Sequence, residues 1–226
     1  GGWVGRTAEG RGGGGGPFGW VKVGRRGGVN VRGGGAGAGL AVGGTGGNGS
    51  SKGTGGTITN AFAPANTGML TLGQAGGTQT YAGGLDTTGA GGPVTLNGTI
   101  QTIGNPMTLA MATLGSNTTL RGSALTVTGA LTGAGMDLTL DFSTPFTLPG
   151  GITGVNNFTS PKAINVSGSF ATSGMQTYNA AGTLTGNPVL TGTALTLGGR
   201  LSGAGKDLTL DFSRPLTVPG GVAASA

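Results

Sequence analysis

The stretch GALTGAGMDLTLDFSTPFTLPGGI, residues 129–152, returns as GRLSGAGKDLTLDFSRPLTVPGGV, residues 199–222. Aligned at an offset of 70 residues, the two copies match at 17 of 24 positions. In residues 137–142, DLTLDF, leucine and phenylalanine alternate with aspartate and threonine. Alternation with a period of two predicts a strand that buries one face.

A second marker repeats at a different distance. The sequence QTY at residues 79–81 recurs at residues 176–178, which is 97 positions later. The first copy therefore has 27 more residues than the second between QTY and DLTLDF. This is about the length of one coil of a solenoid, so we expect the insertion of one whole coil, which such folds tolerate because each coil packs only on its neighbours.

Short apolar clusters follow one another every six to eight residues, with Gly, Asn, Pro or Ser between most of them. Two architectures fit such short strands: an antiparallel sandwich and a parallel β-solenoid. The long repeat favours the solenoid. The scarcity of two-residue hairpin turns favours it too, because Asn97-Gly98 is the one serious hairpin candidate.

The composition excludes several kinds of chemistry. The chain of 226 residues has 56 Gly, no Cys, no His and a single Glu, Glu9. Without Cys and His there is no disulfide framework, no zinc finger and no Ser-His-Asp or Cys-His catalytic centre. Only 8% of the residues are charged, which leaves little material for amphipathic helices. What remains is an all-β protein, a Gly-rich disordered chain, or one followed by the other.

Glycine and charge divide the chain into two parts. Residues 1–56 hold 26 of the glycines, and the net charge of +6 arises before residue 61. We predict a Gly-rich, poorly structured basic linker or extension at residues 1–56. Residues 57–226 are predicted to form the solenoid, with modules at about 76–152 and 173–222.

The basic N-terminal part contains Trp3, Phe18 and Trp20 among its Lys and Arg residues. Such a segment could bind single-stranded nucleic acid, acidic polysaccharide or a membrane surface. A solvated linker is favoured, and no specific nucleic-acid partner is predicted. The chain starts at Gly1 without a recognisable leader and has no run of 18 apolar residues. We therefore expect an internal segment of a longer protein, without a transmembrane helix.

Aspartates of the repeat are the candidates for chemistry. Residues 133–138, GAGMDL, resemble part of a calcium-binding nonapeptide, but the copies lie 70 residues apart instead of in tandem. The pairs Asp137/Asp141 and Asp207/Asp211 could be imagined as the two carboxylates of a glycosidase. A catalytic site is normally unique, so these repeated residues are expected to be structural. We predict no catalytic, cofactor-binding or metal-binding residue, and no cofactor.

Two further patterns were weighed. The Gly-rich residues 33–56 do not match a phosphate-binding loop, because Lys52 follows Ser51 where the motif needs Gly. Pairs of threonine in T-x-T order resemble the flat faces of ice-binding solenoids. Those faces need threonine at one register on successive coils, and here the pairs recur at no fixed spacing. No ice-binding face is therefore expected.

Residues 159–212 are similar to the repeat modules of filamentous-haemagglutinin-type adhesins, large bacterial exoproteins exported by two-partner secretion. In these modules sGxQTYN precedes vxLtgtxltl and GxLxGAGxDLTL, as it does here. Residues 76–142 form a looser copy, in which Ala82 follows Tyr81 instead of Asn. The resemblance covers about residues 68–226.

The resemblance implies a right-handed parallel β-helix in a secreted or surface-exposed bacterial protein. It also implies adhesion or biofilm contact with host or surface glycans or proteins, and an outer-membrane transporter as export partner. Neither the family's secretion domain nor a toxin segment is visible, so we expect the shaft of an adhesin. Two alternatives remain open: a structural protein that assembles through its coil ends, and a polysaccharide-acting β-helix enzyme.

Overall fold

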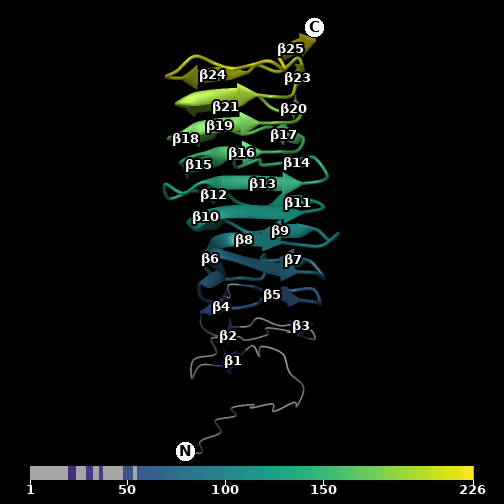
Figure 1. The fold of residues 1–226 in the computed structure, drawn as a ribbon, viewed down its shortest axis with the longest axis vertical. Coiled ribbons are helices and arrows are strands. Elements are labelled where there is room, and N and C mark those ends of the chain that lie inside the picture. Colours follow the sequence, from purple (N-terminus) through teal and green to yellow (C-terminus); the bar gives the residue numbers. More distant parts are fainter. Residues whose placement is uncertain (1–19, 24–28, 33–35, 38–47, 53–54, 226) are drawn as a thin grey trace, which may run out of the picture.

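A computed structural model describes residues 20–23, 29–32, 36–37, 48–52 and 55–225 of the chain. The strands stack as successive coils along one long axis, with the C-terminal coil at one end (Figure 1). Cα partners on adjacent coils are 17 to 24 residues apart in the sequence. The predicted all-β, parallel β-solenoid is confirmed. No described helix is long and apolar enough to cross a membrane.

Three faces run along the axis. The first two are continuous ladders of parallel strands, whereas the third is divided between residues 127 and 146 into parallel sheets of three and five strands. The first face consists of β2 (Val29–Arg32), β4 (Gly49–Lys52), the first parts of β6 (Leu70–Tyr81), β8 (Val94–Gln101) and β10 (Ala112–Gly122), then β12 (Leu131–Thr132), β15 (Ile152–Val155), β18 (Phe170–Thr172), β21 (Val189–Gly192) and β24 (Thr209–Phe212). The second face consists of β3 (Ala36–Gly37), β5 (Gly55–Ile58), the last parts of β6, β8 and β10, then β13 (Leu138–Phe142), β16 (Phe158–Ser160), β19 (Met175–Tyr178) and β22 (Ala194–Leu197).

The third face consists of β7 (Leu85–Asp86), β9 (Met107–Leu109), β11 (Leu125–Val127), β14 (Phe146–Thr147), β17 (Ile164–Val166), β20 (Gly182–Leu184), β23 (Leu201–Ala204) and β25 (Val222–Ser225). One described pair departs from this pattern: β1 (Trp20–Val23) is antiparallel to β2. The structure therefore stacks β2, β4 and β5 on the same ladders as the later coils. The division of the chain near residue 56 remains a prediction from composition.

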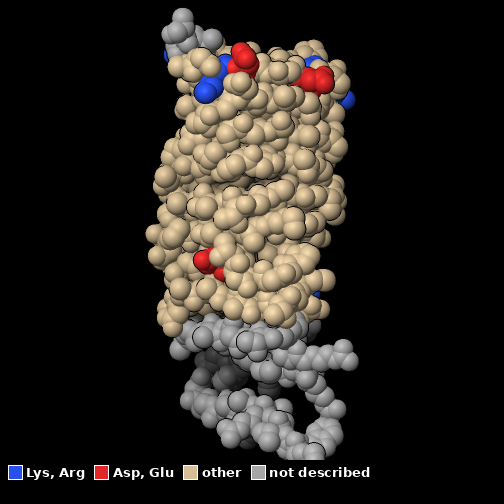
Figure 2. Space-filling model, turned by 180° about the vertical axis from the view of Figure 1, so that it is seen from behind, with Lys and Arg blue, Asp and Glu red and all other residues tan. Residues whose placement is uncertain are grey.

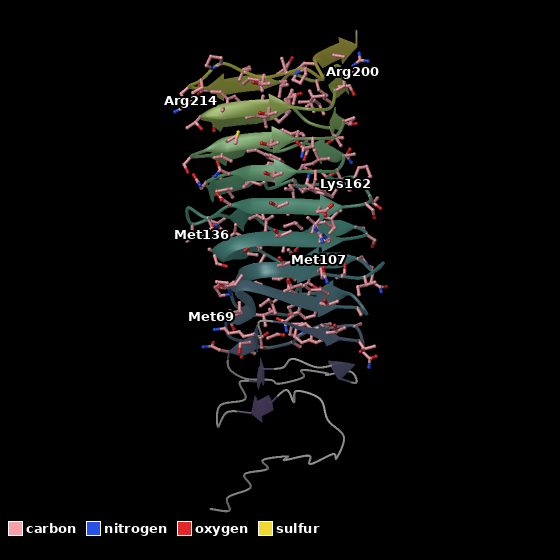
Figure 3. The ribbon with its side chains drawn as sticks, viewed as in Figure 1. Met69, Met107, Met136, Lys162, Arg200 and Arg214 are labelled. Atoms are coloured by element: carbon pink, nitrogen blue, oxygen red, sulfur yellow. The ribbon has the colours of Figure 1, made fainter. Side chains whose placement is uncertain are left out.

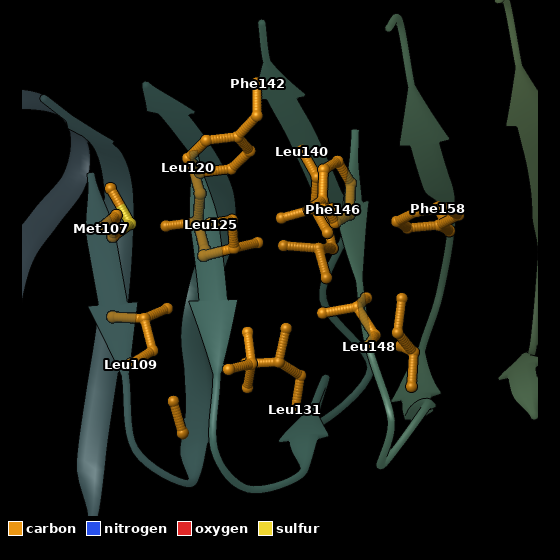
Figure 4. Close-up of a cluster of buried hydrophobic side chains, with 14 of the residues drawn as sticks. Met107, Leu109, Leu120, Leu125, Leu131, Leu140, Phe142, Phe146, Leu148 and Phe158 are labelled. Carbon is orange, nitrogen blue, oxygen red and sulfur yellow. The ribbon is translucent and has the colours of Figure 1, made fainter. Parts of the chain in front are cut away.

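The core is a column of apolar side chains between the three faces. Ile100, Leu120 and Leu140 stand opposite one another on successive coils and are fully buried. Figure 4 shows leucines and phenylalanines of different strands pointing toward one another in this column. Burying one such side chain stabilises the fold by about 1.5–3 kcal/mol. The alternation seen in the sequence thus defines the interior of every coil.

The two copies of the sequence repeat do not occupy the same faces. DLTLDF of the first copy forms β13 on the second face, whereas that of the second copy forms β24 on the first face. The QTY elements of β6 and β19 both lie on the second face. The 27 extra residues therefore supply one coil and one additional strand, and the expectation of a single whole coil is wrong. The first and second faces are similar enough for the same sequence to build either of them.

Asn97-Gly98 does not form a hairpin. Both residues lie within β8, which is parallel to its neighbours β6 and β10, and Gly98 turns the chain at the corner between the first and second faces with φ at 65°. At the same corner β6 inserts residues 74–77 and β10 inserts residues 115–117. The short corner of β8 is therefore flanked by two longer ones.

Candidate functional site

A row of threonines runs along the second face, one on each successive coil. Its members, which we call the threonine ladder, are Thr78, Thr99, Thr119, Thr139, Thr159, Thr177, Thr196 and Thr217. Strands in register lie about 4.8 Å apart. Turns of variable length make the sequence spacing irregular while the register in space stays constant. The assumption that threonines here share no register is therefore wrong.

The neighbouring outward row is not made of threonine. Two residues further along each strand, Thr80, Gln101, Arg121 and Asp141 face one another on successive coils. The Arg121 Nε donates to Asp141 Oδ2 at 2.9 Å, in an ion pair that is partly exposed. The second face therefore carries one threonine row beside a mixed polar row, and not the double row of a T-x-T face.

Asparagines at the corners join one coil to the next. Asn117 Oδ1 accepts a hydrogen bond from Asp137 N at 3.0 Å, and Asn187 Oδ1 accepts one from Asp207 N at 3.2 Å. These are the same contact in the two copies of the repeat, on different corners of the solenoid. A corner amide that would otherwise lack a partner is satisfied in this way. Asn117 and Asn187 lie 70 residues apart, upstream of the two quoted repeat copies, but only their pairing shows this role.

The carboxylate of Asp137 belongs to this corner network. Its Oδ1 accepts hydrogen bonds from Asn156 Nδ2 at 2.9 Å and from both N and Nδ2 of Asn157 at 3.0 Å. Gly133, at the start of the calcium-like motif, lies against the backbone of Val155 on the next coil. The motif therefore builds a turn that packs on its neighbour, and the described residues contain no cluster of three acidic side chains that could hold a metal ion.

The aspartates predicted as outward carboxylates are thus placed as follows. Asp137 is held by asparagines of the next coil, and Asp141 is paired with Arg121. Among the described residues, no donor reaches the carboxylate of Asp207 or that of Asp211. Of the N-terminal candidates, Lys52 ends β4 and is exposed, while Trp3, Phe18 and the side chain of Trp20 fall outside what the structure describes.

The QTY elements have a buried role that the sequence did not reveal. Gln176 Nε2 donates to Phe170 O at 2.8 Å and to Thr191 O at 2.9 Å, so it ties its own coil to the next. Its Oε1 accepts a hydrogen bond from Tyr178 Oη at 2.9 Å. Gln79 similarly donates through Nε2 to Ser51 Oγ at 2.6 Å. The alternation of side chains along the strand places each glutamine on the inward face. This alternation is the sequence signal that could have predicted the burial of the glutamines.

Both tyrosines of the QTY elements lie in the core. Tyr81 and Tyr178 are 0% and 2% exposed. Burial raises the pKa of both hydroxyl groups above the ordinary value of 10.0, because the core does not solvate the phenolate. Each also packs on a phenylalanine ring, with Tyr81 against Phe62 and Tyr178 against Phe158. These tyrosines are structural.

A groove opens at the corner between the first and second faces. It has a volume of about 580 Å³ and is lined by residues 75–77, 98–99, 115–119, 136–137 and Thr139. Its lining comes from four successive coils, so the groove runs along the axis. The long corners of β6 and β10 supply the rim residues 75–77 and 115–117, and the short corner of β8 contributes Gly98 between them.

Most of the surface around the shaft is uncharged. Figure 2 shows the back of the molecule, where the charged side chains gather mainly near the C-terminal end. In Figure 3, Met136 of the groove lies along one edge of the solenoid, and Lys162 and Arg200 lie along the opposite edge.

Comparison with protein-family models, with curated proteins and with solved structures gives no match to this chain.

Proposed function

We propose that this chain is a non-enzymatic shaft segment of a secreted or surface-exposed bacterial adhesin. The observation that carries the proposal is the unbroken stack of coils with a continuous apolar core. Such a stack holds its surface along a stiff line, which suits a protein that must reach away from a cell. The similarity of residues 68–226 to filamentous-haemagglutinin-type repeats supports the same function and the same export through an outer-membrane transporter.

The faces of the shaft support a role in contact rather than in catalysis. They present threonine hydroxyls on each coil, and Asp137 and Asp141, the carboxylates first considered for chemistry, have structural partners. Many weak contacts along one rigid object combine into strong attachment. Adhesion to host or surface glycans or proteins would then come from the length of the shaft.

A bead assay tests this function. Beads coated with the purified chain are allowed to settle on epithelial cells and on glass, and their detachment under flow is measured. We expect them to resist higher flow than beads coated with albumin. A matched variant, T159K/T177K/T196K, changes only outward positions of the ladder and should detach earlier. Retention no better than with albumin would refute the adhesin function.

Self-assembly is the second candidate, and the ladders of parallel strands in register favour it, because such strands can pair with further strands at a coil end. If copies stack in this way, electron microscopy will show rods that lengthen with protein concentration. Rods of one fixed length would exclude it.

A further inference from the structure

The groove at the corner between the first and second faces is built by differences in coil length. Residues 74–77 of β6 and 115–117 of β10 are extra residues in the corners of the coils before and after Gly98. A Cβ atom at Gly98 would collide with the carbonyl oxygen atoms of Gln74 and Gly77, so the rim packs directly on this glycine. The groove is therefore a fixed feature of the backbone.

Hydroxyl groups line the groove at regular intervals. Thr99, Thr119 and Thr139 of the threonine ladder project along it, and their hydroxyls have no hydrogen-bond partner among the described residues. Four coils at about 4.8 Å each give the groove a length of roughly 14 Å between its first and last strand. This is the scale of a short oligosaccharide, with one free threonine hydroxyl on each of the last three coils.

The electrostatics of the groove favour an uncharged ligand. Its lining contains no Lys or Arg, and its single carboxylate, Asp137, is already bonded to Asn156 and Asn157. A nucleic acid or an acidic polysaccharide would need cations for its charges. An extended peptide would need free backbone groups at a sheet edge, whereas the strands here are paired on both sides.

We infer that this groove binds an uncharged polysaccharide, which lies along the axis and exchanges hydrogen bonds with the hydroxyls of Thr99, Thr119 and Thr139. Met136 adds an apolar surface for the face of a sugar ring. The inference rests on the proposed adhesin function, since it names the class of ligand that the shaft would hold. Binding of an uncharged polysaccharide in the groove differs from attraction by the basic N-terminal segment, which would select acidic polysaccharides.

Affinity electrophoresis of the full chain tests the inference. Gels contain either a neutral polysaccharide (laminarin, mannan or galactan) or acidic alginate. We expect at least one neutral polysaccharide to retard the chain, with no loss at higher salt. Absence of retardation in every neutral gel, or salt-sensitive retardation by alginate alone, would overturn the inference. The adhesin function would survive that result if the bead assay still showed attachment.

Matched variants locate the binding site. The triple variant T99V/T119V/T139V removes three groove hydroxyls and keeps the β-branched shape of each side chain. The control T108V/T126V/T183V makes the same changes on the third face, outside the groove. We expect the first variant to lose retardation and the second to keep it, with both retaining the circular-dichroism spectrum of the parent. Equal retardation of the two would place binding elsewhere.

Discussion

At the scale of single residues, the corner asparagines and Asp137 hold successive coils together. Asp137 accepts three hydrogen bonds from the next coil, whereas no described residue donates to the carboxylate of Asp207, its counterpart in the second copy. Asp207 lies in the last described coil, so the described residues include no following coil that could donate to its carboxylate. The sequence shows the repetition of these residues but not the coil that each one meets.

Replacement of Asp137 by alanine leaves the side-chain amides of Asn156 and Asn157 without their acceptor. An unsatisfied polar group costs about 1–3 kcal/mol, so we expect D137A to lower the midpoint of thermal unfolding measured by circular dichroism. The matched variant D207A should change stability by no more than about 0.5 kcal/mol. Equal effects of the two variants would show that the corner network does not act as described.

Gly98 offers a second test at this scale. Its φ of 65° is almost that of Gly104, at 67°, but a Cβ at Gly104 would meet open space. The left-handed conformation costs either variant about 1–2 kcal/mol. G98A must in addition displace the rim at Gln74, so its unfolding midpoint should fall well below that of G104A. Similar unfolding midpoints of G98A and G104A would mean that the backbone at Gln74 shifts at no cost in stability, and that the groove is not fixed.

At the scale of strands, alternation in the sequence predicted the elements but not their positions on the faces. DLTLDF was expected to be a strand with a buried face, and β13 is one, with Leu138, Leu140 and Phe142 inward. Its second copy forms β24 on another face. Face assignment depends on how many strands lie between the copies, and short strands separated by variable turns do not reveal that number. Asn97-Gly98, the one hairpin candidate in the sequence, lies instead within the parallel strand β8.

The two QTY strands predict an unusual alkaline titration. Tyr81 and Tyr178 are the only tyrosines, and burial raises the pKa of both. A raised folded-state pKa stabilises the fold at pH below the ordinary value of 10.0, and this contribution is lost as the pH rises above it. We therefore expect tyrosinate absorbance to appear only together with loss of the β-spectrum. A titration near pH 10 in the folded chain would contradict this burial.

At the scale of the whole molecule, the threonine ladder follows from the stacking of the coils. The sequence led to a solenoid through its long repeat and its alternating strands. It did not reveal the ladder or the groove, because turns of different length hide the common register. The same differences in length that obscure the ladder in the sequence create the raised rims at Gln74 and Ser116.

The central claim is that the chain forms one stiff shaft with a straight ladder on it. The chain has no Cys, so spin labels can be attached at introduced cysteines alone. Distances from Thr99 to Thr139, Thr177 and Thr217 span two, four and six coils, and we expect narrow distributions that lengthen by about 4.8 Å per coil. Broad distributions, or distances that do not grow in proportion to the number of coils, would contradict the shaft.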